Sequence, residues 1–315
     1  MIAARLYQGL EEPCERRPRP STGGPAQVSS IATGDLGFTD LSAPVSLQIL
    51  IGLLMFALVF VPLERWIALR QQPVFRPGWS TDVIYYVAGC FVGKFTDAIS
   101  FGAMLRIRKL SGLDSSGVVA GQPAWIQFLE LVIVADFLAY VFHRALHQYG
   151  WLWRFHRVHH SSRRMDWLAN VRLHPIDKIL GDCFQFIPIF CLGFASAPLL
   201  AYTIILGFQG FLNHSNTRIS FGFLRWIIAS PQFHHWHHCD NPPQAYPGAY
   251  HKNFAPHLVI FDRLFGTIHL PADERSMPER YGVPESVPTG FWGQLMYPFR
   301  SSNWASRVSC QVERS

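Results

Sequence analysis

Long apolar stretches alternate with short polar segments along this chain of 315 residues. The first stretch runs from Leu41 to Leu63 without a charged residue, which is long enough for a helix to cross a lipid bilayer. Two more apolar stretches lie at about Val83 to Leu105 and at about Trp125 to Phe142. This pattern predicts an all-α integral-membrane protein, because a helix satisfies its own backbone hydrogen bonds inside the bilayer.

The last apolar stretch, Cys183 to Asn213, is too long for one straight span. As a single helix it would reach about 46 Å, whereas the hydrocarbon core of a bilayer is about 30 Å thick. Pro188, Gly193 and Pro198 lie within it, so we expect either a kinked helix or a hairpin of two shorter helices. The four stretches together predict a bundle of about four transmembrane helices.

Charged residues in and beside the apolar stretches indicate how these stretches lie in the membrane. Arg65, Arg70 and Arg76 follow the first stretch, which places that end on the cytoplasmic side. Lys94 and Asp97 interrupt the second stretch. Because charged groups inside a bilayer are costly, we expect these two side chains to pair on one helix face.

The composition agrees with a membrane protein. Only 15% of the residues are charged, compared with about 25% in a typical soluble domain. The net charge of +6 suits the anionic surface of a cytoplasmic leaflet. No long Lys/Arg run or basic-aromatic motif is present, so we expect no nucleic-acid partner. The 6 cysteines form no CxxC pair and indicate no disulfide framework.

Histidines are concentrated in one part of the chain, where 11 of the 14 lie between His143 and His238. Eight of them form three clusters at helical spacing: His143 and His147; His156, His159 and His160; and His234, His237 and His238. Residues three or four apart share a helix face, and neutral imidazole is a common metal ligand. Because a structural zinc site needs only four ligands, the eight histidines predict a site for two metal ions.

Other histidines are weaker candidates. His214 closes the last apolar stretch and is the best candidate for a ninth ligand, although a helix-terminal histidine bonded to a carbonyl is the alternative. His174 is open between a metal ligand and a residue that supports one. His235 does not share the spacing of its cluster and is left out. Three histidines in the Pro- and Gly-rich tail are expected to be structural or to support the metal ligands: His251, His257 and His269.

Asp136 and Tyr140 lie on the same helical stripe as His143 and His147. A carboxylate at this position either accepts the outer N–H of a ligand imidazole, which fixes the ring orientation, or pairs with Lys94 in the bundle. Both alternatives remain open from the sequence.

The order and spacing of these residues resemble the fatty acid hydroxylase/sterol desaturase superfamily of integral-membrane non-haem diiron oxygenases. The resemblance runs from about Leu63 to Arg300. It rests on these motifs: Asp136 with Tyr140, His143 and His147; Leu152 to Ser161; Arg172 to Pro175; Asn213 to Asn216; Pro231 to His238; and Asp262 to Thr267.

The resemblance implies a dimetal site in a cytosolic helical cap, with two Fe ions that use O2 to hydroxylate or desaturate a lipid such as a sterol, fatty acyl chain or carotenoid. Zinc can replace the iron in purified protein. The implied ligands are His143, His147, His156, His159, His160, His214, His234, His237 and His238. Family members often carry another histidine four residues before His214, where this chain has Gly210, so His174 or water is expected to complete that metal. The segment from Asn241 to His251 also holds extra Pro and Gly residues.

The resemblance also implies a division of the chain. We expect a disordered tail over residues 1–40, transmembrane segments over 41–120, the catalytic region over 121–270 and a peripheral tail over 271–315. No fused cytochrome domain is evident, so a separate electron donor of the cytochrome or ferredoxin type is expected. The alternatives are a membrane metal-transport protein, a haem-carrying electron-transfer protein and an inactive family member.

Overall fold

The computed structural model describes residues 44–112, 119–240 and 252–300. The predicted tail over residues 1–40, the Pro- and Gly-rich segment over 241–251 and residues 301–315 lie outside the described part. Every regular element in the described part is a helix, and three isolated β-bridges join its loops. The predicted all-α class is therefore confirmed.

Two described helices are long and apolar enough to cross a membrane, whereas the sequence predicts about four spans. They are α2 (Val45–Trp66) and α4 (Ala124–Gln148). On α2, Leu54 and Leu58 are 57% and 72% exposed. Apolar side chains exposed to this extent along one helix suit contact with lipid better than contact with water.

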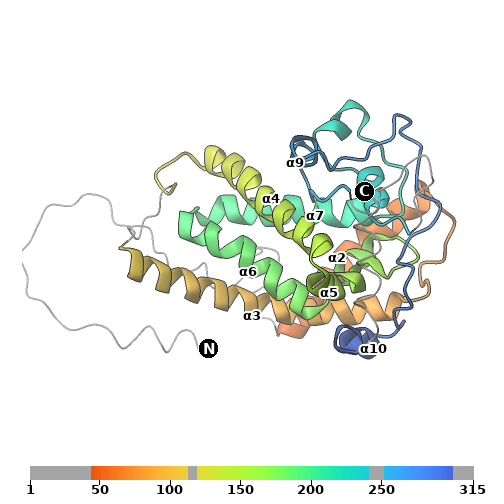
Figure 1. Ribbon diagram of the computed structural model, residues 1–315, viewed down its shortest axis with the longest axis horizontal. Coiled ribbons are helices and arrows are strands. Elements are labelled where there is room, and N and C mark those ends of the chain that lie inside the picture. The colour runs from red at the N-terminus through yellow and green to blue at the C-terminus, as the bar shows by residue number, and fades with distance from the viewer. Residues whose placement is uncertain (1–43, 113–118, 241–251, 301–315) are drawn as a thin grey trace, which may run out of the picture. The chain divides into compact units, whose positions relative to one another are not determined.

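The long helices pack side by side. Helix α3 (Trp79–Ser111) packs along α6 (Pro175–Leu192), and α4 packs against both α6 and α7 (Ser196–His214) (Figure 1). Buried apolar side chains fill the space where α4, α6 and α7 meet: Leu131, Ala135, Ile189, Phe194, Tyr202 and Leu206.

The apolar stretch from Cys183 to Asn213 forms a hairpin and not one kinked helix. Gly193 ends α6 in the left-handed conformation, with a φ of 79°, which glycine adopts without steric cost. Pro188 lies inside α6 without ending it. The hairpin brings His214, the last residue of α7, back toward the end of α4 that carries the first histidines.

Lys94 and Asp97 do not form the ion pair expected from the sequence. The ion pair at this level of the bundle joins Lys178 and Asp182 on α6, at 2.8 Å. The hydroxyl of Thr96 on α3 also donates to Asp182, at 2.7 Å. The expectation was wrong: Lys94 and Asp97 are both exposed, and the charges that pair inside the bundle belong to α6.

Short helices gather where α4 and α7 end. Helix α5 (Gly150–His160) follows α4 after a single residue, and α8 (Pro231–His237) packs against α7. The remaining short elements are η2 (Trp167–Val171), η3 (Gly222–Trp226), α9 (Ile260–Leu264), α10 (Phe291–Met296) and η5 (Tyr297–Phe299).

Candidate metal centre

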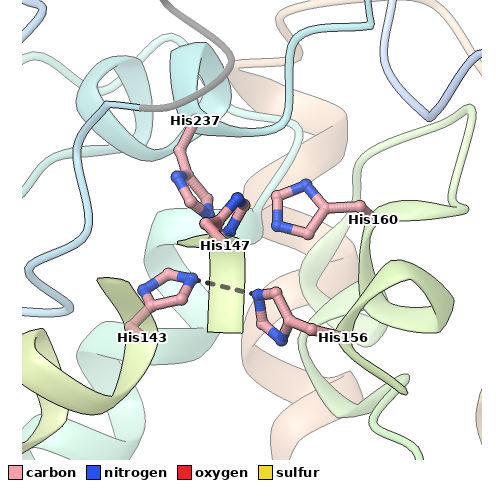
Figure 2. A group of neighbouring side chains, drawn as sticks. All are labelled: His143, His147, His156, His160 and His237. Carbon is pink, nitrogen blue, oxygen red and sulfur yellow. Dashed lines mark hydrogen bonds between the residues drawn. The ribbon is translucent and has the colours of Figure 1, made fainter. Parts of the chain in front are cut away.

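The structure brings together the nine histidines that the sequence predicts as ligands, and it sorts them into two groups. Within each group, one ring nitrogen of every histidine lies within 4.8 Å of the others. All nine are buried except the half-buried His143. The five-histidine group is His143, His147, His156, His160 and His237 (Figure 2), and the four-histidine group is His159, His214, His234 and His238.

Each of the two clusters with histidines at positions i, i+3 and i+4 contributes ligands to both groups. On α5, His156 and His160 are one turn apart and face the five-histidine group, while His159 faces the four-histidine group. On α8 the arrangement is reversed: His234 and His238 face the four-histidine group and His237 faces the other. A pair at i and i+4 therefore supplies one group, and the residue at i+3 supplies its neighbour.

In three rings of the five-histidine group, the nitrogen that points away from the centre of the group, here called the outer nitrogen, is hydrogen-bonded to an oxygen. This bond sets the tautomer of the ring. Nδ1 of His143 donates to the Phe254 carbonyl (2.7 Å), Nδ1 of His156 to the Asp177 carboxylate (2.8 Å) and Nδ1 of His237 to the Lys252 carbonyl (2.8 Å). Because a carbonyl or carboxylate oxygen only accepts, Nδ1 carries the proton and Nε2 keeps its lone pair.

In the four-histidine group, too, Nδ1 faces outward and Nε2 faces the centre of the group. Nδ1 of His159 donates to the Arg172 carbonyl at 3.3 Å, and Nδ1 of His214 donates to the Gly210 carbonyl at 2.9 Å. The Nε2 atoms point inward. Those of His214 and His234 are 2.9 Å apart, and those of His234 and His238 are 3.0 Å apart.

This arrangement leaves lone pairs facing each other. The Nε2 atoms of His159 and His214 lie 3.2 Å apart, and those of His143 and His156 lie 3.1 Å apart, as the dashed line in Figure 2 marks. Two lone pairs at this distance repel unless a proton or a metal ion lies between them. Burial holds the pKa of His159 well below its usual value, which disfavours the proton. A metal ion fits the geometry.

Buried ring nitrogens without partners support the same conclusion. Both nitrogens of His160 and Nδ1 of His238 are buried and have no hydrogen-bond partner among the described residues. A buried polar atom left in this state costs about 1–3 kcal/mol. Burial also holds the pKa of His160 and His238 well below the usual value, so both rings are neutral and can bind a metal. Imidazole donors suit iron, zinc, copper and nickel.

Asp136 has neither of the partners considered from the sequence. Its carboxylate accepts from the backbone N–H groups of His257 and Leu258, at 3.0 and 2.8 Å. Among the described residues it contacts no ligand imidazole and does not pair with Lys94. Both alternatives were wrong, because a loop more than 100 positions later in the chain folds back onto α4 and presents two unpaired N–H groups.

The other candidate histidines lie outside both groups. His174 caps the start of α6: its Nδ1 accepts from the Ile176 N–H and its Nε2 donates to the Leu295 carbonyl, both at 3.1 Å. It therefore does not replace a ligand missing at Gly210. The side of Gly210 that faces η2 is covered by Asn170, whose side chain would lie 3.6 Å from an added Cβ. His235 is fully buried between Tyr281 and the Ser215 carbonyl.

Sequence reasoning missed the residues that support the ligands. Asp177 has no distinguishing spacing, because its partner His156 lies on another helix. Arg172 stood in a quoted motif without a role, and its guanidinium pairs with buried Asp82 at 2.5 Å while its carbonyl holds His159. The available signal was a charged residue, Arg172, within a motif that lies close to the histidines in the sequence.

Residues 128–267 match the family model described as fatty acid hydroxylase. Over 178 residues, 56% of the chain, the sequence is 34% identical to ornithine lipid hydroxylase OlsE of Rhizobium tropici and covers 51% of it. Over 168 residues, 52% of the chain, it is 30% identical to alkylglycerol monooxygenase of Xenopus tropicalis and covers 34% of it.

A third relative has a different name. The chain is 28% identical over 221 residues, 66% of its length, to very-long-chain aldehyde decarbonylase GL1-4 of Oryza sativa subsp. indica, and covers 32% of that protein. The chain thus spans about half or less of these curated relatives. No solved structure matches it.

Proposed function

We propose, from the match of residues 128–267 to the fatty acid hydroxylase family model, that the protein is a membrane-bound, O2-dependent diiron enzyme that hydroxylates a lipid. The observation that carries the proposal is the pair of facing histidine groups, whose inward lone pairs need a cation in each group. Nine nitrogen donors suit two metal ions, and the complete set argues against an inactive family member.

Relatives favour hydroxylation over desaturation. Ornithine lipid hydroxylase and alkylglycerol monooxygenase are both named for oxygen insertion into a lipid, and both are at least 30% identical to this chain. We therefore propose a lipid acyl or alkyl chain as the substrate, with electrons supplied by a separate cytochrome- or ferredoxin-type donor. The lipid reaches the site from the bilayer along the apolar helices.

The residues have separable tasks in this reaction. The nine histidines would hold two irons, which supply the activation of O2 that oxidation of a C–H bond requires. Burial of eight of these rings excludes bulk water from the metal centre. The outer hydrogen bonds to Phe254, Asp177 and Lys252 hold three of the rings with Nε2 directed inward.

A comparison of cellular lipids by mass spectrometry tests the proposal. Cells that produce the wild type should accumulate a lipid that has gained one oxygen, and cells with His237→Ala should lack it. His174→Ala, which removes a histidine outside both groups, is the matched control and should retain the product. A product that has lost two hydrogens would identify a desaturase. An undiminished product in His237→Ala cells would refute the proposed mechanism.

A further inference from the structure

A short segment over residues 252–258, here called the strap, supplies outer hydrogen bonds to one histidine group. The Lys252 carbonyl accepts from His237 at 2.8 Å, and the Phe254 carbonyl accepts from His143 at 2.7 Å. Both histidines belong to the five-histidine group. The conformation of the strap therefore sets the tautomer and the orientation of two rings that come from different helices, α8 and α4.

Asn253 lies between these two carbonyls and pins the strap to α8. Its φ is 62°, in the left-handed region that favours asparagine and glycine. Its side-chain Nδ2 donates to the Phe233 carbonyl at 2.8 Å and to the His269 carbonyl at 2.7 Å. Phe233 belongs to the same short helix as His237, so Asn253 holds together a ligand and the segment that bonds to it.

Asp262 holds the middle of the strap. Its buried carboxylate accepts from the backbone N–H groups of Phe254 and Ala255, at 2.9 and 2.7 Å, and from the Thr267 hydroxyl at 2.7 Å. The Tyr140 hydroxyl on α4 lies 3.0 Å from the same Thr267 hydroxyl. These contacts account for the Asp262 to Thr267 motif, which contains no metal ligand.

The four-histidine group uses other supports. Nδ1 of His159 and Nδ1 of His214 donate to the carbonyls of Arg172 and Gly210, which lie after η2 and within α7. Arg172 is held in turn by Asp82 of α3 at 2.5 Å. None of these hydrogen bonds involves the strap. The outer hydrogen bonds of the two groups thus come from different segments of the chain.

We propose that Asn253 and Asp262 are positioning residues for one of the two metal ions: through the strap they set metal affinity at the five-histidine group and leave the four-histidine group unaffected. The proposal rests on the proposed function in that each group binds a metal ion. An outer hydrogen bond fixes the ring of a metal-bound histidine and raises its basicity, and its loss typically costs about 10–100-fold in metal affinity.

Cobalt(II) titration of the purified full-length protein in detergent, with bound metal counted by mass spectrometry, tests the proposal. The wild type should bind two ions. Asp262→Asn places an amide N–H against backbone donors. Asn253→Gly retains the left-handed backbone but loses the side-chain hydrogen bonds to the Phe233 carbonyl and to the carbonyl and N–H of His269. Each variant should bind one ion with unchanged affinity and the other about 10–100-fold more weakly. Asp273→Asn, at a position outside the strap, should match the wild type.

Double variants identify the weakened group. In a His234→Ala background, which disables the four-histidine group, Asp262→Asn should weaken the remaining cobalt ion. In a His237→Ala background the same substitution should leave the remaining ion unchanged. Asn253→Gly should change cobalt affinity in the same way in the two backgrounds. It replaces Asp262→Asn in the experiment if that variant does not fold.

Three results would overturn the role of the strap. Asp262→Asn could weaken cobalt binding only in the His237→Ala background, or equally in both backgrounds, or both strap variants could bind cobalt with wild-type affinity. A wild-type protein that binds fewer than two ions would instead overturn the proposed function. Folding is checked within each single variant, because retention of the second ion at wild-type affinity requires an intact α5, α7 and α8.

Discussion

Asp177 accepts the Nδ1–H of His156 at 2.8 Å, and it is the only carboxylate hydrogen-bonded to one of the nine histidines within the described part of the chain. The outer partners are backbone carbonyls for four other ligand histidines: His143, His159, His214 and His237. The pair joins α5 to the first turn of α6, and both side chains are about 5% exposed or less. A negative charge at this position favours a metal ion on His156 more than a neutral carbonyl does.

Asp177→Asn should lower metal affinity at the five-histidine group by about tenfold, and Asp177→Ala by up to about 100-fold. The amide oxygen of asparagine still accepts the Nδ1–H, so only the charge is lost, whereas alanine loses the hydrogen bond as well. Competition titration with a chelator measures both values. Equal affinity of the two variants would show that orientation by the hydrogen bond is unimportant.

His174→Ala should retain both metal ions. His174 caps α6 through the Ile176 N–H, so its removal should lower the free energy of unfolding by about 1 kcal/mol. Metal content and the apparent melting temperature in detergent check the two parts of this prediction. Loss of one metal ion in this variant would show that His174 is a ligand after all.

His235 should make stability depend on pH. Burial lowers its pKa to about 3, compared with about 6.5 in an unfolded chain. Its contribution to stability is therefore complete above pH 6.5 and is lost as the pH falls toward 3, because the unfolded chain binds the proton first. Between pH 6.5 and 5 the loss should be about 2 kcal/mol.

His235→Gln removes this titration while its amide can still donate to the Ser215 carbonyl. The wild type should melt at a higher temperature than the variant at pH 7, and the difference should narrow as the pH is lowered to 5. Melting in detergent at a series of pH values measures it. A difference that stays constant would mean that His235 titrates alike in both states.

We propose that the histidine groups lie on the cytoplasmic side of the membrane, and this location predicts on which side the C-terminus lies. Arginines after α2 indicate a cytoplasmic end for that helix, and the metal centre must be accessible to an aqueous electron donor. A C-terminal green fluorescent protein fusion should fluoresce, and a C-terminal alkaline phosphatase fusion should be inactive. Active phosphatase would place the histidines on the opposite side.

The sequence was most informative where function depends on neighbours along one helix. His156, His159 and His160 could be identified from their spacing, because a helix turn alone brings them to adjacent positions. The hairpin after Cys183 could be limited to two alternatives, because Gly193 and two prolines disfavour one straight helix. These features are local, and so their physical causes are visible in short segments.

The sequence was least informative where the partner is remote or is a backbone group. Asp136 was assigned to an imidazole or to Lys94, but it binds two N–H groups of the strap. No residue type marks a backbone N–H as unpaired. Likewise, the assignment of each histidine to one of two groups depends on the packing of α5 against α8, which no spacing rule specifies.

The origin of the ligands in four helices constrains when the metal centre can assemble during synthesis. His143 emerges from the ribosome well before His237, and the carbonyl that orients His143 belongs to Phe254. Asp262 and Thr267, which hold that carbonyl in place, are made later still. The proposed metal centre can therefore be complete only after residue 267 has been translated, which would make metal insertion a late event in the maturation of this protein.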